Sequence, residues 1–175
     1  MIHRFILNEV SYFGPGARKM LPQEIKRLGL HKALVATDKE LIRFGVAQKV
    51  LDVLEEAGVP YELFSEIKPN PTVRNVKAGV KAFSESGADF ILAIGGGSSI
   101  DTAKAIGIIT NNPSFSDVVS LEGVADTQRK SVPIIALPTT AGTAAEVTIN
   151  YVITDEEKQK KMVCVDPNDI PAIAI

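Results

Sequence analysis

Short apolar runs and stretches of helical periodicity alternate along most of this chain. Four apolar runs have the length and composition of strands, and they cover residues 32–37, 90–94, 132–137 and 172–175. Tyr61–Phe64 also predicts a strand. Four stretches place apolar side chains at helical spacing, and they cover residues 17–28, 45–57, 72–84 and 98–109. Strands without polar alternation are buried on both faces. The pattern therefore predicts an α/β fold, with a mostly parallel, Rossmann-like sheet and helices on both faces.

Two other patterns predict β-hairpins. Near the N-terminus, Phe5–Leu7 and Val10–Phe13 have the character of two short strands close together in sequence. Farther along, residues 147–153 and 161–165 predict a second hairpin, whose turn is the charged run Asp155–Lys158.

Single residues mark the expected helix ends. Gly29 and Gly58 follow helical stretches and suit C-terminal caps, whereas Thr72 suits the N-cap of the helix that it precedes. Residues 114–123 are expected to form a loop with one short helix. The 175 residues contain no fixed repeat and no low-complexity linker, so we expect one domain over residues 1–175.

The composition narrows the function classes. Hydrophobic residues make up 45% and charged residues 23%, which is typical of a globular protein with a sizeable core. The net charge is −2 and no basic block interleaves with aromatic residues, so the sequence does not favour nucleic-acid binding. Cys164 is the only cysteine and lies in an apolar run. An internal disulfide and a cysteine-type zinc site are therefore excluded, and Cys164 is expected in the core.

The N-terminal residues lack the long apolar segment and the small-residue cleavage site of a signal peptide. No stretch approaches the about 20 apolar residues that a membrane-spanning helix needs. We therefore expect a cytoplasmic protein with no membrane partner.

One strand-to-helix junction carries the strongest chemical signal. The apolar run before it leads directly into Gly95–Ser98, after which helical periodicity begins. Glycines let backbone N–H groups approach a ligand, and a helix N-terminus adds unpaired donors, so the junction predicts a phosphate site. The alternative is an ordinary turn capped by Ser98 or Ser99. The third glycine of the common dinucleotide fingerprint is absent, because Ile100 and Thr102 follow the turn.

Two motifs resemble those of the iron-type (group III) alcohol dehydrogenases. The first is the glycine turn followed by Asp101 and Lys104, and the second is Pro138–Glu146, which looks like that family's P-T-T-x-G-T-x-S/A-E. Both lie in the family's order and spacing, and the likeness continues through Ile153–Asp155 and Asp166-Pro167. The resemblance covers the whole chain. It implies an NAD(H)-binding domain of an oxidoreductase that transfers hydride between NAD and a small alcohol or aldehyde.

The resemblance also implies roles for cofactor-binding residues. Asp38 follows a strand, where an acidic side chain can accept hydrogen bonds from the adenosine ribose and favour NAD over NADP. The alternative role for Asp38 is a helix cap before Lys39. Gly96, Gly97 and Ser98 would hold the pyrophosphate.

Further cofactor contacts are implied on the following loops. By resemblance, Thr139, Thr140 and Thr143 contact the adenine and diphosphate side, although threonines can also simply cap a turn. Asn70 lies between two prolines, and the family places this asparagine at the cofactor. Asp101 is expected in the first turn of its helix, where it would orient the glycine turn or the nicotinamide side.

The second hairpin is expected at the nicotinamide end. By resemblance, Asn150, Val152 and Lys161 line the region of the nicotinamide ribose, with Lys161 donating to a ribose hydroxyl. A lysine on a strand that faces solvent is the alternative for Lys161.

The resemblance does not extend to a metal site in this chain. Family members are much longer, and their helical C-terminal domain supplies the metal ligands, an aspartate and three histidines. The chain has only His3 and His31, both expected at the surface, so we assign no metal ligand and no catalytic residue. A divalent metal, Fe or Zn, is expected only in a full-length enzyme. We expect the chain alone to turn over little alcohol.

A second hypothesis concerns assembly. An edge strand such as Phe5–Leu7 offers unpaired backbone groups to a partner, and family members commonly dimerise through this region. We therefore expect a homodimer through the N-terminal strands. The alternative function is a non-catalytic dimerisation or assembly fragment with an incomplete cofactor site.

Overall fold

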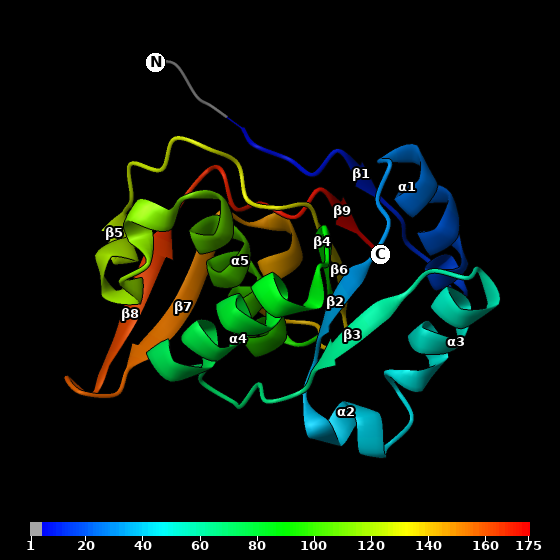
Figure 1. The fold of residues 1–175 in the computed structure, drawn as a ribbon, viewed down its shortest axis with the longest axis horizontal. Helices are drawn as coiled ribbons and strands as arrows, with labels where there is room; N and C mark the ends of the chain where they lie inside the picture. The colour runs from blue at the N-terminus through cyan, green and yellow to red at the C-terminus, as the bar shows by residue number, and fades with distance from the viewer. Residues whose placement is uncertain (1–4) are drawn as a thin grey trace.

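The computed structural model describes residues 5–175 and contains the predicted parallel sheet (Figure 1). The six strands in spatial order are β1 (Val10–Ser11), β9 (Ile173–Ala174), β6 (Ile134–Pro138), β4 (Phe90–Gly95), β2 (Ala33–Ala36) and β3 (Tyr61–Phe64). Every neighbouring pair in this sheet is parallel. The predicted α/β class with a Rossmann-like sheet is confirmed.

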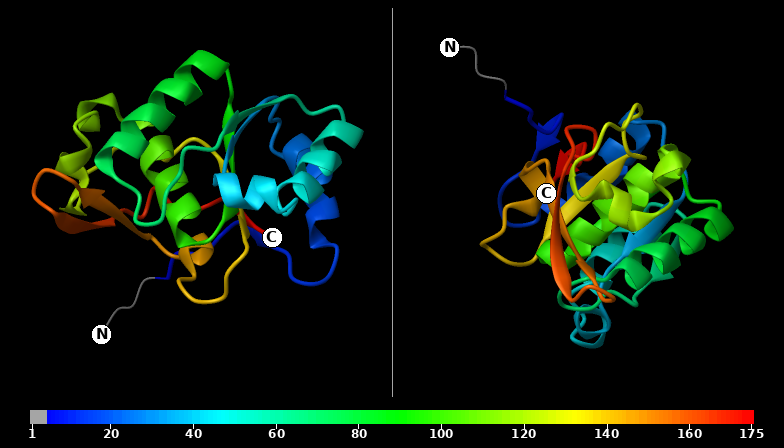
Figure 2. Two further views of the ribbon diagram at one scale, coloured as in Figure 1. Left: turned by 90° about the horizontal axis from the view of Figure 1, so that it is seen from below. Right: turned by 90° about the vertical axis from the view of Figure 1, so that its left-hand side faces the viewer.

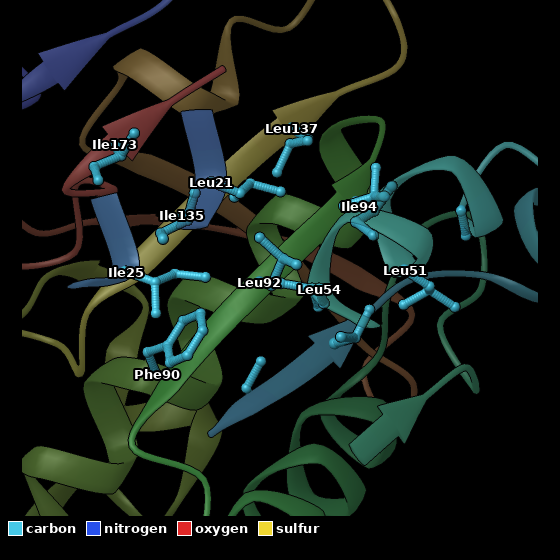
Figure 3. Packing of buried hydrophobic residues seen from close by; sticks show 14 residues of the cluster. Leu21, Ile25, Leu51, Leu54, Phe90, Leu92, Ile94, Ile135, Leu137 and Ile173 are labelled. Atoms are coloured by element: carbon cyan, nitrogen blue, oxygen red, sulfur yellow. The ribbon is translucent and has the colours of Figure 1, made fainter. Parts of the chain in front are cut away.

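Two helices, α1 (Leu21–Arg27) and α3 (Gln48–Glu56), cover one face of the sheet. Figure 3 shows side chains of these two helices directed toward Phe90, Leu92 and Ile94 of the central strand β4. All six residues of β4 and all four of β2 are buried. This burial on both faces explains why these strands are continuous apolar runs without polar alternation.

The opposite face is covered by α4 (Val73–Ser86) and α5 (Gly97–Asn111), which pack through Phe83, Ile100 and Ile106. A second, smaller sheet lies on the far side of α5, so α5 is enclosed between two sheets (Figure 1). Because both sides of α5 are covered, ten of its fifteen residues are buried.

The smaller sheet has the order β5 (Gly123–Val124), β8 (Lys160–Val165) and β7 (Asn150–Asp155). Strands β7 and β8 form the predicted antiparallel hairpin. Its buried side chains include Tyr151 and Cys164, which confirms the expected core position of the cysteine.

The short helices depart most from the predicted boundaries. They are η1 (Ala17–Met20), α2 (Lys39–Arg43), η2 (Pro113–Phe115), η3 (Val118–Leu121) and η4 (Ala145–Val147). The predicted helix over 17–28 thus begins as a 3₁₀ turn, and the expected loop over 114–123 contains two 3₁₀ turns. Helix α2 escapes prediction because five residues are too few to establish a helical period. Within residues 5–175, no helix combines the length and the apolar character needed to cross a bilayer.

The predicted N-terminal hairpin is wrong. Residues 5–7 form no strand, and Val10–Ser11 pairs in parallel with β9. The physical reason is a long-range anchor. The Asn8 side-chain amide donates to the carbonyl oxygens of Glu146 and Pro171, both at 2.8 Å. These bonds tie the segment to distant loops. His31 is exposed as expected, whereas His3 lies outside the described residues.

Helix α4 provides a test of the local sequence signals. Thr72 Oγ1 accepts from the Asn75 backbone N–H and Asn75 Oδ1 accepts from the Thr72 N–H, each at 3.3 Å, which forms a capping box. We predict that Thr72→Ala lowers the free energy of unfolding by about 1 kcal/mol, because the first turn loses its acceptor. Urea denaturation of the purified chain measures this loss.

Ser84→Ala is the matched control, since Ser84 is an exposed residue within the same helix. Loss of the Ser84 hydroxyl should leave the free energy of unfolding nearly unchanged. Equal midpoints for the two variants would show that the capping box does not stabilise α4.

Candidate functional site

The order of the strands creates a crevice between β2 and β4. The chain runs from β2 to its outer neighbour β3 and then returns to β4 on the other side of β2. Helix α3 follows β2 on one face, whereas α5 follows β4 on the opposite face, so the chain leaves the two strands in diverging directions. Open α/β sheets bind ligands at such a switch point, outside the carboxyl ends of the strands.

A cleft of about 860 Å³ lies at this switch point. The left view of Figure 2, seen from below, shows helix α2 (cyan) and the gold loop after β6, and residues of both line the cleft. The cleft brings together half of the twelve residues predicted for cofactor binding, namely Asp38, Gly96, Gly97, Ser98, Thr139 and Thr140.

The glycine turn presents bare backbone to this cleft. Gly95 has a φ of 149°, a conformation that suits glycine. A Cβ atom on Gly96 would lie 3.0 Å from Thr140 Oγ1, and one on Gly97 would lie 2.9 Å from Thr143 Cγ2. Side chains at these two positions would therefore fill the space between the glycine turn and residues 139–144 after β6, here called the threonine loop.

The start of α5 is not capped in the way that the alternative interpretation required. Gly96 is the N-cap, and among the described residues no side chain caps this helix end. Capping by Ser98 or Ser99 is therefore wrong, because both residues already lie inside the helix. The first N–H groups of α5 point toward the cleft end of the helix, as an anion site requires.

The sequence left two alternative roles for Asp38, a helix cap and a residue of the cofactor site, and its position is compatible with both. Asp38 is the N-cap of α2, and its Oδ1 accepts from the Leu41 N–H at 2.8 Å. The half-buried side chain also lines the cleft at the end of β2. The capping role is thus observed, and it fixes the carboxylate beside the cleft.

The threonine loop is partly ordered by its own side chains. The Thr139 N–H donates to the Gly95 carbonyl at 3.0 Å, which holds the start of the loop against the glycine turn. Thr143 Oγ1 accepts from the Ala145 N–H at 3.3 Å, so the turn-capping alternative is observed for this threonine. Thr139 and Thr140 are exposed and line the cleft.

Asn70 is not among the residues that line the cleft, although its neighbour Pro69 is. It is exposed and has a φ of 54°, a left-handed conformation that asparagine tolerates. Asn70, which the resemblance places at the cofactor, is thus adjacent in sequence to a residue of the cleft wall and does not line the cleft itself.

A second group of predicted residues lies on the other side of α5. Asp101 is the fifth residue of this helix, so its expected place in the first turn is wrong. Its Oδ2 accepts from the Val152 N–H of β7 at 3.0 Å, and burial raises its pKa to about 6. Asn150 is exposed at the start of β7, and Lys161 is exposed on β8 opposite Thr154. Helix α5 thus connects the cleft group with the hairpin group.

Two buried charged residues lie near this second group. Lys104 was named in the first motif without a role, and Asp169 was not identified from the sequence. Lys104 and Asp169 are both fully buried, with Nζ 3.9 Å from Oδ1. Burial lowers the pKa of Lys104 and raises that of Asp169 to about 8. A signal for Lys104 was available, because it interrupts the apolar run Ala103–Ile109 of a helix packed on both sides.

The apolar wall of the cleft was also missed. It includes Leu41 of α2, Ile67 of the loop between β3 and α4, and Ala78 of α4, which share no local sequence pattern. Such a wall can receive a flat apolar ring, whereas the glycine turn offers N–H donors. Within residues 5–175, no three His, Cys, Asp or Glu side chains lie together as metal ligands. The glycine turn and the apolar wall together suit an anionic organic ligand that carries a flat ring.

Comparison with known proteins identifies a family and several similar proteins. The family model described as iron-containing alcohol dehydrogenase matches residues 8–175. Lactaldehyde reductase of Escherichia coli is 59% identical over 99% of this chain and 46% of its own length. Choline dehydrogenase of Bacillus subtilis is 41% identical over 91% of this chain and 40% of its own length.

Solved structures share the fold over the whole chain. A 1,3-propanediol oxidoreductase superposes with a TM-score of 0.94 at 35% identity, covering 100% of this chain and 45% of that one. Sulfoacetaldehyde reductase from Bifidobacterium kashiwanohense, solved in complex with NAD⁺, has a TM-score of 0.85 at 30% identity and covers 100% and 46%. The chain thus spans less than half the length of these relatives and matches their N-terminal half. It belongs to the iron-containing alcohol dehydrogenase family.

Proposed function

We propose that the cleft binds NAD(H) and that the chain is the dinucleotide-binding part of an oxidoreductase acting on a small alcohol or aldehyde. The observation that carries this proposal is the uncapped, glycine-lined start of α5 at the switch point of the sheet. A diphosphate suits this place, because the helix N-terminus combines N–H donors with partial positive charge. A bound NAD⁺ in the sulfoacetaldehyde reductase structure supports the choice of dinucleotide.

The parts of the dinucleotide would be divided among the surrounding elements. The adenine ring suits the apolar wall around Ile67, and Asp38 would accept from the adjacent ribose hydroxyls. The N–H groups of Gly97 and Ser98 would hold the diphosphate. The other end of the ligand would then extend toward Asn150 on the hairpin.

In the proposed reaction, the nicotinamide ring accepts or donates the hydride when NAD(H) is bound. The residues of this chain bind and orient the dinucleotide.

Titration with NADH and NADPH tests the proposal directly. We predict saturable NADH binding by calorimetry and NADPH binding at least about tenfold weaker, because the added phosphate would lie against the Asp38 carboxylate. Asp38→Asn should narrow this difference. The amide oxygen keeps the cap to the Leu41 N–H, so stability should be retained while the negative charge is lost.

Glu40→Gln is the control for a general charge effect, since Glu40 also lines the cleft but is not at the end of β2. It should leave the preference for NADH unchanged. Absence of NADH binding by the wild-type chain contradicts the proposed function. An unchanged preference in Asp38→Asn contradicts the role of Asp38 alone.

We also propose that the chain forms a homodimer through its N-terminal segment. Phe5, Leu7 and Phe13 are largely or fully exposed and flank β1, the edge strand of the main sheet. Exposed apolar side chains beside an unpaired strand edge favour association. This surface remains the basis of the alternative function as an assembly fragment.

Sedimentation over a range of concentrations tests this proposal. We predict a dimer whose population falls at low concentration, and a shift toward monomer in the variant Phe5→Ser/Leu7→Ser, which removes apolar area from the segment. A wild-type chain that stays monomeric at all concentrations contradicts the dimer. Dimers formed by a chain that does not bind NADH would favour the assembly function.

A further inference from the structure

Lys104 makes an unusual set of contacts for a lysine. Its side chain is fully buried and extends from the middle of α5 toward the start of β7. Its Nζ donates to the carbonyl oxygens of Thr148 and Asn150, the latter at 2.9 Å. The Asp169 carboxylate lies 3.9 Å away on the chain between β8 and β9. Two of the ammonium's three N–H groups thus have hydrogen-bond acceptors, and Asp169 lies close enough to balance the charge but too far to accept a hydrogen bond.

This arrangement is costly if its only purpose is stability. Among the described residues, neither carboxylate oxygen of Asp169 has a hydrogen-bond partner, and both are buried. Replacing a buried ion pair by apolar side chains is often neutral or stabilising. What apolar side chains could not supply is the pair of directed bonds from Lys104 to the carbonyls of Thr148 and Asn150.

Lys104 acts together with Asp101 on the same strand. The two residues are three positions apart in α5, so their side chains emerge on one face of the helix. Asp101 accepts from the N–H of Val152, and Lys104 donates to the carbonyl of Asn150. One helix therefore holds alternate residues of β7 by an acceptor and a donor. Asn150 and Val152 are also the residues at the hairpin side of the proposed NAD site.

The location of α5 gives this connection a functional meaning. Its first turn forms the proposed diphosphate site, and its second and third turns hold the beginning of β7. The exposed Asn150 follows the threonine loop that leaves the cleft at the end of β6. Helix α5 thus sets the distance between the diphosphate site at its start and the hairpin residues that the other end of the ligand would reach.

We propose that Lys104 is a positioning residue that fixes the hairpin residues Asn150 and Val152 relative to the diphosphate site. Lys104 does not touch the cofactor and acts through the backbone of β7. This inference rests on the proposed function, because it assigns the hairpin to the nicotinamide half of the dinucleotide.

A comparison of two ligands separates positioning from general destabilisation. ADP probes the cleft half of the site alone, whereas NADH probes both halves. For Lys104→Met, we predict an unchanged affinity for ADP and an affinity for NADH about tenfold lower, because the bonds that hold β7 are lost. The NADH fluorescence titration is accompanied by hydrogen exchange, in which the Val152 amide should exchange faster than in the wild-type chain.

Two further variants make the result decisive. Lys81→Met removes an exposed lysine of α4 and should bind both ligands as the wild type does. Lys104→Met/Asp169→Asn also removes the buried Asp169 carboxyl group, which loses its partner in the single variant, so it keeps the test valid if the single variant does not fold. It should show the same selective loss of NADH affinity.

The possible outcomes distinguish this inference from the proposed function. If the wild-type chain binds ADP and NADH but the folded Lys104 variant binds NADH equally well, the positioning role is overturned while the proposed function stands. Equal losses for ADP and NADH would also overturn it, since they indicate general damage to the cleft. If the wild-type chain binds neither ligand, both the proposed function and this inference fail.

Discussion

The enclosure of helix α5 between two sheets is the constraint on which the other features of this protein depend. Its inner side packs on the parallel sheet through Ile100 and Ile106, and its outer side packs on the hairpin sheet through Ile108 and Ile109. The contact with α4 is so close that a Cβ on Gly79 would lie 2.2 Å from Ile106 Cδ1. A helix held on all sides cannot shift without opening three packed surfaces. Its first turn is therefore fixed at the carboxyl end of the sheet.

The candidate site follows from this fixed helix. A diphosphate needs N–H donors that are in place before the ligand arrives, and the rigid start of α5 provides them without a side chain in the way. The same helix carries Asp101 and Lys104, whose bonds to β7 set the position of the hairpin. The cleft and the hairpin, which belong to different sheets, are thus organised by one element.

Much of the fold could be predicted because its strongest signals are local. The runs at 90–94 and 132–137 are strands buried on both faces, so hydrophobicity alone identifies them. Thr72 caps α4 through atoms only three residues away. The N-terminal hairpin failed because Asn8 bonds to carbonyls 138 and 163 residues distant, which no local pattern reveals.

In the candidate site too, contiguous motifs could be predicted from the sequence, whereas contacts between distant residues could not. The glycine turn and the threonine loop were identified because each is a contiguous motif that ends a strand. Asp101 was recognised but misplaced, since the helix begins at Gly97 and puts this carboxylate beyond the first turn. Asp169 carries no local signal, and only the packing of its loop against α5 brings it to Lys104.

Two single glycine-to-alanine variants, compared with each other, test most directly whether the start of α5 is the surface that binds the dinucleotide. Gly97→Ala adds a methyl group where Thr143 Cγ2 lies 2.9 Å away, whereas a Cβ on Gly142 meets nothing within 4 Å. We predict that both variants fold, that Gly142→Ala binds NADH as the wild type does, and that Gly97→Ala binds it at least about tenfold more weakly. Wild-type affinity in Gly97→Ala would contradict the account.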